Sequence, residues 1–223
     1  MFYLPISLLL FLAILLLVLP ILALNLTVDV VEIAVAKLGF SPSFAVVLLL
    51  LVILGSAINI PLYKSKSSVT KMDTSSSLWL KEFWGIPLKR IQNYTVIALN
   101  VGGGLIPVVL ALYQFSQASA VAILIVTAIV STVSYKGARV VPGIGIQMHP
   151  LLAPVTAALS AMLIATNHAA PVAFAGGVLG TLIGADLLHL KDIQSISSGV
   201  LSIGGAGVFD GIALCGLFAL LLT

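Results

Sequence analysis

Long apolar runs without any charged residue dominate this sequence of 223 residues. The first run covers residues 2–24 and contains no Asp, Glu, Lys or Arg. A run of about 20 apolar residues is long enough to cross the hydrocarbon core of a bilayer as a helix. Only 8% of the residues are charged, whereas soluble domains carry roughly 25%. So few charges cannot cover a core with a wetted surface, and the sequence therefore predicts an integral membrane protein.

The apolar runs predict an all-α fold, a polytopic transmembrane bundle of about seven spans that forms one domain over residues 1–223. Each predicted span is a largely apolar segment near the length that a bilayer requires. The spans are expected at about 2–24, 43–62, 94–115, 119–135, 150–166, 171–190 and 198–222.

The basic residues predict the orientation. All but Lys37 of the ten Lys and Arg residues follow the second, fourth or sixth span. They are Lys64, Lys66, Lys71, Lys81, Lys89, Arg90, Lys136, Arg139 and Lys191. Basic loops remain in the cytoplasm, so the N-terminus is expected inside and the C-terminus outside. We expect a multi-pass plasma-membrane protein with the lipid bilayer as partner and no nucleic acid, because the basic residues flank spans and form no stripe.

Two loops have patterns that are typical of the membrane surface. Over residues 27–40, apolar side chains recur at helical spacing from Val28 to Leu38, which predicts a short amphipathic helix. Residues 78–90 contain two tryptophans among basic residues, which predicts a segment at headgroup depth.

Gly-rich clusters interrupt three of the predicted segments. Asn100 precedes three consecutive glycines, residues 142–150 form an irregular stretch, and residues 204–207 hold three glycines. Irregular backbone at membrane depth is tolerated only where protein buries it or where it lines a wet cavity. Broken or re-entrant segments are therefore expected.

Glycine also serves close helix packing. Gly176, Gly180 and Gly184 recur every fourth residue on the predicted sixth span. This spacing predicts a small-xxx-small groove that receives a neighbouring helix.

Two acidic residues are expected at membrane depth. Asp186 lies about one turn before the end of the sixth span, and Asp210 is followed by twelve mostly apolar residues. An acid at the centre of a span costs roughly 2.5–3.5 kcal/mol on insertion scales, which points to a pathway, a partner or a reaction.

Two arrangements of these acids are open. A regular helix over residues 197–207 would separate the two carboxylates in depth. If the segment from Gly204 to Gly207 unwinds or re-enters, Asp210 comes near Asp186, and the pair would share one proton, with one acid as base and the other as acid. The candidate catalytic residues are thus Asp186 and Asp210. The candidates for shaping the backbone or the substrate site are Gly204, Gly205, Gly207, Gly211 and Asn100.

A metal site is a further possibility. His189 follows Asp186 by three residues, so the two share a helix face. This spacing serves metal ligation in helical bundles. With Asp210, and with His149 as a further ligand, a divalent ion could be held. The alternative is a solvated histidine at the interface and no cofactor. His168 is expected to be a plain loop residue.

Three motifs resemble a known family. Ile183 to Leu188 and Ile203 to Gly211 look like the C-terminal signature of a prokaryotic membrane protein family, common in archaea, which is catalogued as domain of unknown function sixteen-fourteen. Gly55 to Leu62 looks like its N-terminal motif. The resemblance implies a polytopic membrane protein.

A looser similarity is to intramembrane aspartyl proteases of the presenilin and signal-peptide-peptidase type. Those enzymes carry one Asp on the sixth span and one on the seventh, the second in a Gly-x-Gly-Asp motif. Gly207 and Asp210 match that motif, but Phe209 stands at its second glycine and Ala185 replaces the Tyr before the first Asp. The similarity implies a hydrolase that acts on a membrane peptide.

Four functions therefore remain open. The first is a hydrolase with the Asp186 and Asp210 pair. The second is an ion-coupled small-solute transporter or channel with Asp210 and Asn100 at the midplane, as in broken-helix transporters. The third is a metal-dependent enzyme that uses Asp186, His189 and Asp210, and the fourth is a membrane scaffold without catalysis. No oligomeric state follows from the sequence.

Overall fold

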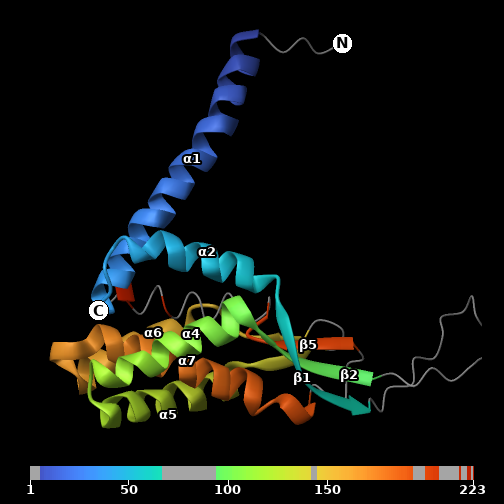
Figure 1. Ribbon diagram of the computed structural model, residues 1–223, viewed down its shortest axis with the longest axis vertical. Helices are drawn as coiled ribbons and strands as arrows, with labels where there is room; N and C mark the ends of the chain where they lie inside the picture. Colours follow the sequence, from blue (N-terminus) through green and yellow to red (C-terminus); the bar gives the residue numbers. More distant parts are fainter. Residues whose placement is uncertain are drawn as a thin grey trace, which may run out of the picture. The chain divides into compact units, whose positions relative to one another are not determined.

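The computed structural model describes residues 6–66, 94–141, 145–192 and 199–205, and the single positions 216, 220, 221 and 223. The chain divides into two compact units, Met1–Leu51 and Val52–Thr223. The described residues are mostly helical (Figure 1).

The first unit is built on one long helix. α1 (Ile6–Lys37) runs through both the segment predicted as the first span, 2–24, and most of the amphipathic segment, 27–40. The prediction of two separate elements is wrong, because no Gly or Pro lies between Pro20 and Gly39 to interrupt the backbone hydrogen bonds. Gly39, at φ 85°, follows the end of the helix.

The end of α1 has buried and exposed side chains, and its amphipathic character at a membrane surface stays a prediction. Val35 and Leu38 are buried, whereas Asp29 is exposed. α2 (Phe44–Ser56) follows.

Among the described residues, three helices are long and apolar enough to cross a membrane. They are Ile14–Lys37, Ala120–Gly137 and Thr166–Asp192. Three apolar helices are shorter, namely Phe44–Ser56, Val101–Ser116 and Leu152–Ile164. The count of seven spans and their orientation stay predictions.

The second unit contains a helical bundle (Figure 1). Its helices are α4 (Ile106–Tyr113), α5 (Ala120–Gly137), α6 (Leu152–Ile164) and α7 (Ala169–Thr181). α7 contacts each of the other three, and its backbone continues as a π-helix, η4 (Leu182–Leu187). Helices are thus present where three of the spans are predicted, at 119–135, 150–166 and 171–190.

Close packing at the glycine groove of α7 is confirmed. A Cβ added at Gly176, Gly180 or Gly184 would collide with α5, at Val126, Val130 and Ser131 in turn. The order of these contacts shows that α5 and α7 run parallel. Their C-terminal ends therefore lie at the same end of the unit.

Three strands form a sheet in the second unit. β2 (Tyr94–Asn100) lies between β1 (Asn59–Lys66), which pairs with it antiparallel, and β5 (Gly199–Ile203), which pairs with it parallel. A separate hairpin joins β3 (Arg139–Val141) to β4 (Gly145–Gln147).

The strands correct the all-α prediction. Parts of the predicted spans 43–62, 94–115 and 198–222 are extended: the first and second combine a short helix with a strand, and the third begins as a strand. Short apolar runs do not distinguish a buried strand from a buried helix by periodicity alone. Pairing satisfies the backbone groups of β2 and those of β1 and β5 that face it, which lipid could not do. The second predicted surface segment, 78–90, lies outside the described residues.

Candidate functional site

Asp186 lies on the π-helical continuation of α7. Its side chain is buried, with 4% of its surface exposed. Its Oδ2 accepts a hydrogen bond from the backbone N–H of Gly204 at 3.0 Å. π-helical turns are rare overall, and many of those that occur lie at functional sites. A buried carboxylate on such a turn is therefore the first component of the candidate site.

The described residues bear on the first of the two predicted arrangements, the regular helix over residues 197–207. Residues 199–203 form a strand rather than a regular helix, and Gly204 follows it at φ 69°. The segment that leads to Asp210 is thus beside Asp186 at Gly204. Asp210, Gly207 and Gly211 lie outside the described residues, and their roles stay predictions.

A polar cluster lies where the strands of the sheet meet their helices. Asn100 is the last residue of β2, and Asn59, its cross-strand partner, is the first residue of β1. The Asn100 Nδ2 donates to the Ser56 carbonyl at 2.7 Å and to Asn59 Oδ1 at 3.2 Å. Ser202, on β5, donates its hydroxyl to the same Asn59 oxygen. Side chains thus tie together the α2–β1 junction, the β2–η1 junction and β5.

Asn100 also caps a second π-helix. Its Oδ1 accepts from the Gly103 N–H at 2.8 Å, at the start of η1 (Val101–Leu105). Only 4% of the Asn100 surface is exposed. A buried amide of this kind is costly unless it is paired, and here its oxygen and its nitrogen are both used.

Glycines allow the backbones around this cluster to touch. A Cβ at Gly204 would lie 2.7 Å from the Cα and N atoms of Gly104. A Cβ at Gly102 would collide with the carbonyl oxygen of Val52, at the C-terminal part of α2. Gly205 adds a turn, since its N–H donates to the Ser202 carbonyl at 3.1 Å. Two of the three predicted Gly-rich breaks therefore meet, while residues 145–147 of the third form β4.

His189 has structural contacts of its own. Its Nδ1 lies 3.2 Å from the Gly184 carbonyl oxygen and 3.1 Å from that of Ala185. Because carbonyls only accept, Nδ1 carries the proton and is not free for a metal. The ring stacks on Tyr135 with 4.7 Å between centroids. This His is buried, which corrects the expectation of a solvated residue.

A metal centre finds no support among the residues that the structure describes. No group of three His, Cys, Asp or Glu side chains is gathered there. His149 is exposed, and its Nδ1 accepts from the Leu151 N–H at 3.3 Å within its own loop. A metal site that includes Asp210 stays a prediction.

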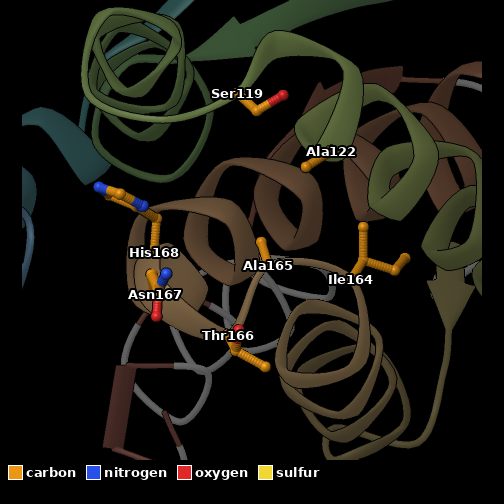
Figure 2. Close-up of a pocket in the computed structure, with 7 residues that line it drawn as sticks. All are labelled: Ser119, Ala122, Ile164, Ala165, Thr166, Asn167 and His168. Atoms are coloured by element: carbon orange, nitrogen blue, oxygen red, sulfur yellow. The ribbon is translucent and has the colours of Figure 1, made fainter.

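A cavity of about 300 Å³ lies at the N-terminal ends of α5 and α7. Figure 2 shows Ser119 and Ala122, from the start of α5, facing the connection between α6 and α7. That connection contributes Ile164, Ala165, Thr166, Asn167 and His168. Its polar side chains are exposed, as expected for a loop that includes His168. This cavity is separated from Asp186 by the length of α7.

Sequence reasoning selected Asp186, Asn100, Gly204 and Gly205, and the structure brings these four into one region. It missed Asn59 and Ser202, although both are polar residues within apolar runs. Asn59 lies in the motif that carries the family resemblance. A single Asn near the end of an expected helix did not stand out, because Asn is common where a helix ends and its side chain bonds the local backbone.

The part of the chain that the structure describes is mostly helical and has three helices long and apolar enough to cross a membrane, which indicates membrane association. The chain belongs to the family described as "Protein of unknown function (DUF1614)", whose model matches residues 53–222. No curated protein and no solved structure matches the chain.

Proposed function

We propose that this chain is an intramembrane hydrolase in which Asp186 and Asp210 share one proton and activate water. The observation that carries the proposal is the hydrogen bond from Gly204 to the buried Asp186. Gly204 precedes Asp210 by only six residues in the sequence. The contact thus supports the re-entrant arrangement, which the pair requires.

The proposed chemistry is that of paired carboxylates. One carboxylate takes a proton from water as the oxygen adds to the carbonyl carbon of a peptide bond, and the other acid gives its proton to the carbonyl oxygen. The C–N bond then breaks as the carboxyl group that took the proton from water gives it to the leaving amine. A hydroxyl of the tetrahedral intermediate returns a proton to the other carboxylate, which restores the shared proton. Burial of Asp186 excludes bulk water, which strengthens these electrostatic interactions.

A membrane peptide in extended form is the proposed substrate. Among the described residues, β5 pairs with β2 on one side and with no strand on the other. β5 ends directly before Gly204, whose N–H contacts Asp186. A peptide laid along the second edge of β5 would place its backbone beside that carboxylate, in the manner of β-strand addition.

Cleavage of a reporter in vesicles tests the proposal. The purified protein is reconstituted with a set of fluorogenic single-span peptides, and turnover is compared with that of Asp186→Asn and Asp210→Asn. Loss of a proton-transfer group is expected to lower kcat by about 10²–10⁴-fold in each variant. Asp192→Asn, the same change at an exposed position six residues on, serves as the matched control and keeps full turnover. Equal turnover in all four proteins would refute the hydrolase.

An ion-coupled transporter is the second candidate. The convergence of broken segments on buried polar side chains favours it, since transporters bind ions where unwound helices meet. Uptake into the same vesicles under a proton or sodium gradient is the test. A gradient-driven uptake that Asp186→Asn abolishes would support the transporter, and uptake that ignores both gradients would remove it.

A further inference from the structure

We infer that Asn100 is a positioning residue, which holds the Gly204 N–H on Asp186 without touching either group itself. The inference names a residue that acts on the site proposed above, and it rests on that function only in treating Asp186 as catalytic. The geometric part stands on contacts among the described residues of the second unit.

The first connection runs through backbone. The Asn100 Oδ1 accepts from the Gly103 N–H at 2.8 Å and so fixes the start of the π-helix. The next residue, Gly104, abuts Gly204 so closely that a Cβ on Gly204 would lie 2.7 Å from two of its atoms. Gly204 in turn donates to Asp186. A shift of the Gly103–Gly104 backbone would therefore be felt directly at the N–H that holds the carboxylate.

The second connection runs through side chains. The Asn100 Nδ2 donates to Asn59 Oδ1, and that oxygen also accepts from the Ser202 hydroxyl. Ser202 precedes Gly204 by two residues and lies next to the end of β5. One amide group therefore controls the position of Gly204 from two sides.

The physical basis is the fixed geometry of a primary amide. Asn presents its acceptor and its two donors in one plane, and here the acceptor bonds η1 while the nitrogen bonds the end of α2 and the start of β1. Because the side chain is buried, water does not replace a lost partner readily. Removal of the amide is expected to loosen Gly204 before it loosens the bundle.

Amide hydrogen exchange at Gly204 tests this inference independently of activity. The sequence holds three Ile–Gly pairs, at 144–145, 183–184 and 203–204. Protein labelled with carbonyl-¹³C Ile and ¹⁵N Gly therefore gives three selected amide signals in a lipid nanodisc. Gly145 lies in β4 and Gly184 in the helix groove, so both are internal controls.

Asn100→Ala is expected to raise the exchange rate of Gly204 by about tenfold or more, with Gly145 and Gly184 within about twofold of wild type. Asn100→Ser keeps a cap for Gly103 and is expected to restore part of the protection. Ser202→Ala cuts only the second connection and gives a smaller rise. Asn167→Ala, at the exposed loop, gives none. If Asn100→Ala does not fold, Asn100→Ser and Ser202→Ala are each compared directly with wild type, and both are still expected to raise the exchange rate of Gly204.

Unchanged exchange at Gly204 in these variants would overturn the inference, and so would an equal rise at all three amides, which would show a general loss of stability. With an active reporter, Asn100→Ala is expected to lower kcat and leave KM unchanged. Failure of the proposed function would give a different result. Turnover would then be the same in wild type and in Asp186→Asn, while the exchange rate of Gly204 would still depend on Asn100.

Discussion

The two ends of the α5–α7 pair differ in how they treat polar groups. At the N-terminal ends, α5 and α7 begin as regular helices beside an open cavity. The polar side chains that line this cavity are exposed, and the buried polar side chain nearby is Gln114, in the turn before α5. At the C-terminal end of α7 the helix widens to a π-turn, a sheet replaces helices, and Asn100 and Asp186 are buried. Buried polar groups cost free energy unless they are paired. At this end both groups are paired, Asn100 with Gly103 and Asp186 with Gly204, which makes it the candidate functional end.

The largest expected effect on folding comes from Gly204→Ala. The new Cβ would lie 2.7 Å from the Gly104 backbone, at a residue with φ 69°. Overpacking costs about 1–3 kcal/mol and the left-handed conformation about 1–2 kcal/mol more. Denaturant unfolding in mixed micelles, followed by circular dichroism, should show a loss of about 2–5 kcal/mol.

Gly145→Ala is the matched control for that change. Gly145 also has a positive φ, 111°, but a Cβ there would meet nothing within 4 Å. Gly145→Ala therefore measures only the free-energy cost of placing Ala at a positive φ. If both variants lose the same free energy of unfolding, the contact between Gly104 and Gly204 contributes nothing.

Gly184→Ala is expected to have the next largest effect. Its Cβ would collide with the Ser131 carbonyl oxygen, a backbone atom that cannot rotate away. We expect a loss of about 1–3 kcal/mol in the same unfolding measurement. At Gly180 the nearest atoms are Val130 Cβ at 2.6 Å and the Thr127 carbonyl oxygen at 2.9 Å. Gly180→Ala should cost less because these contacts are less severe than the closer approach to the Ser131 oxygen at Gly184. The reverse order would place the tight contact at the middle of the groove rather than near Asp186.

The smallest effect is expected at the regular end. Asn167 and His168 are exposed beside the cavity (Figure 2). Replacing either by Ala should change the free energy of unfolding by no more than about 0.5 kcal/mol and leave reporter turnover unchanged. A loss of turnover in His168→Ala would mean that the two ends do not divide structure from function as described.

The sequence predicted the structural features that follow from the periodic spacing of residues and from the free-energy cost of inserting a single charged residue. The spacing of Gly176, Gly180 and Gly184 at every fourth residue predicted a groove for a neighbouring helix, because small residues on one helix face allow close packing. The cost of an acid in an apolar segment marked Asp186, and the glycines around Gly204 marked a break.

The sheet could not be predicted from the sequence, and the reason is physical. A strand such as Tyr94–Asn100 is stabilised by partners distant in the chain, and its own residues are equally compatible with an apolar helix. The role of Asn59 depends on the same pairing, since it meets Asn100 only in the register of β1 and β2. Long-range pairing, rather than local preference, therefore built the candidate site.

The distance between the Asp186 and Asp210 carboxyl groups, measured in an experimental structure of the protein in a lipid nanodisc, tests the central claim most directly. The proposed pair requires that the two groups lie about 3–6 Å apart, close enough to share a proton or a single water. Carboxyl groups that point apart, with Asp210 against other helices and out of reach of Asp186, would contradict the hydrolase.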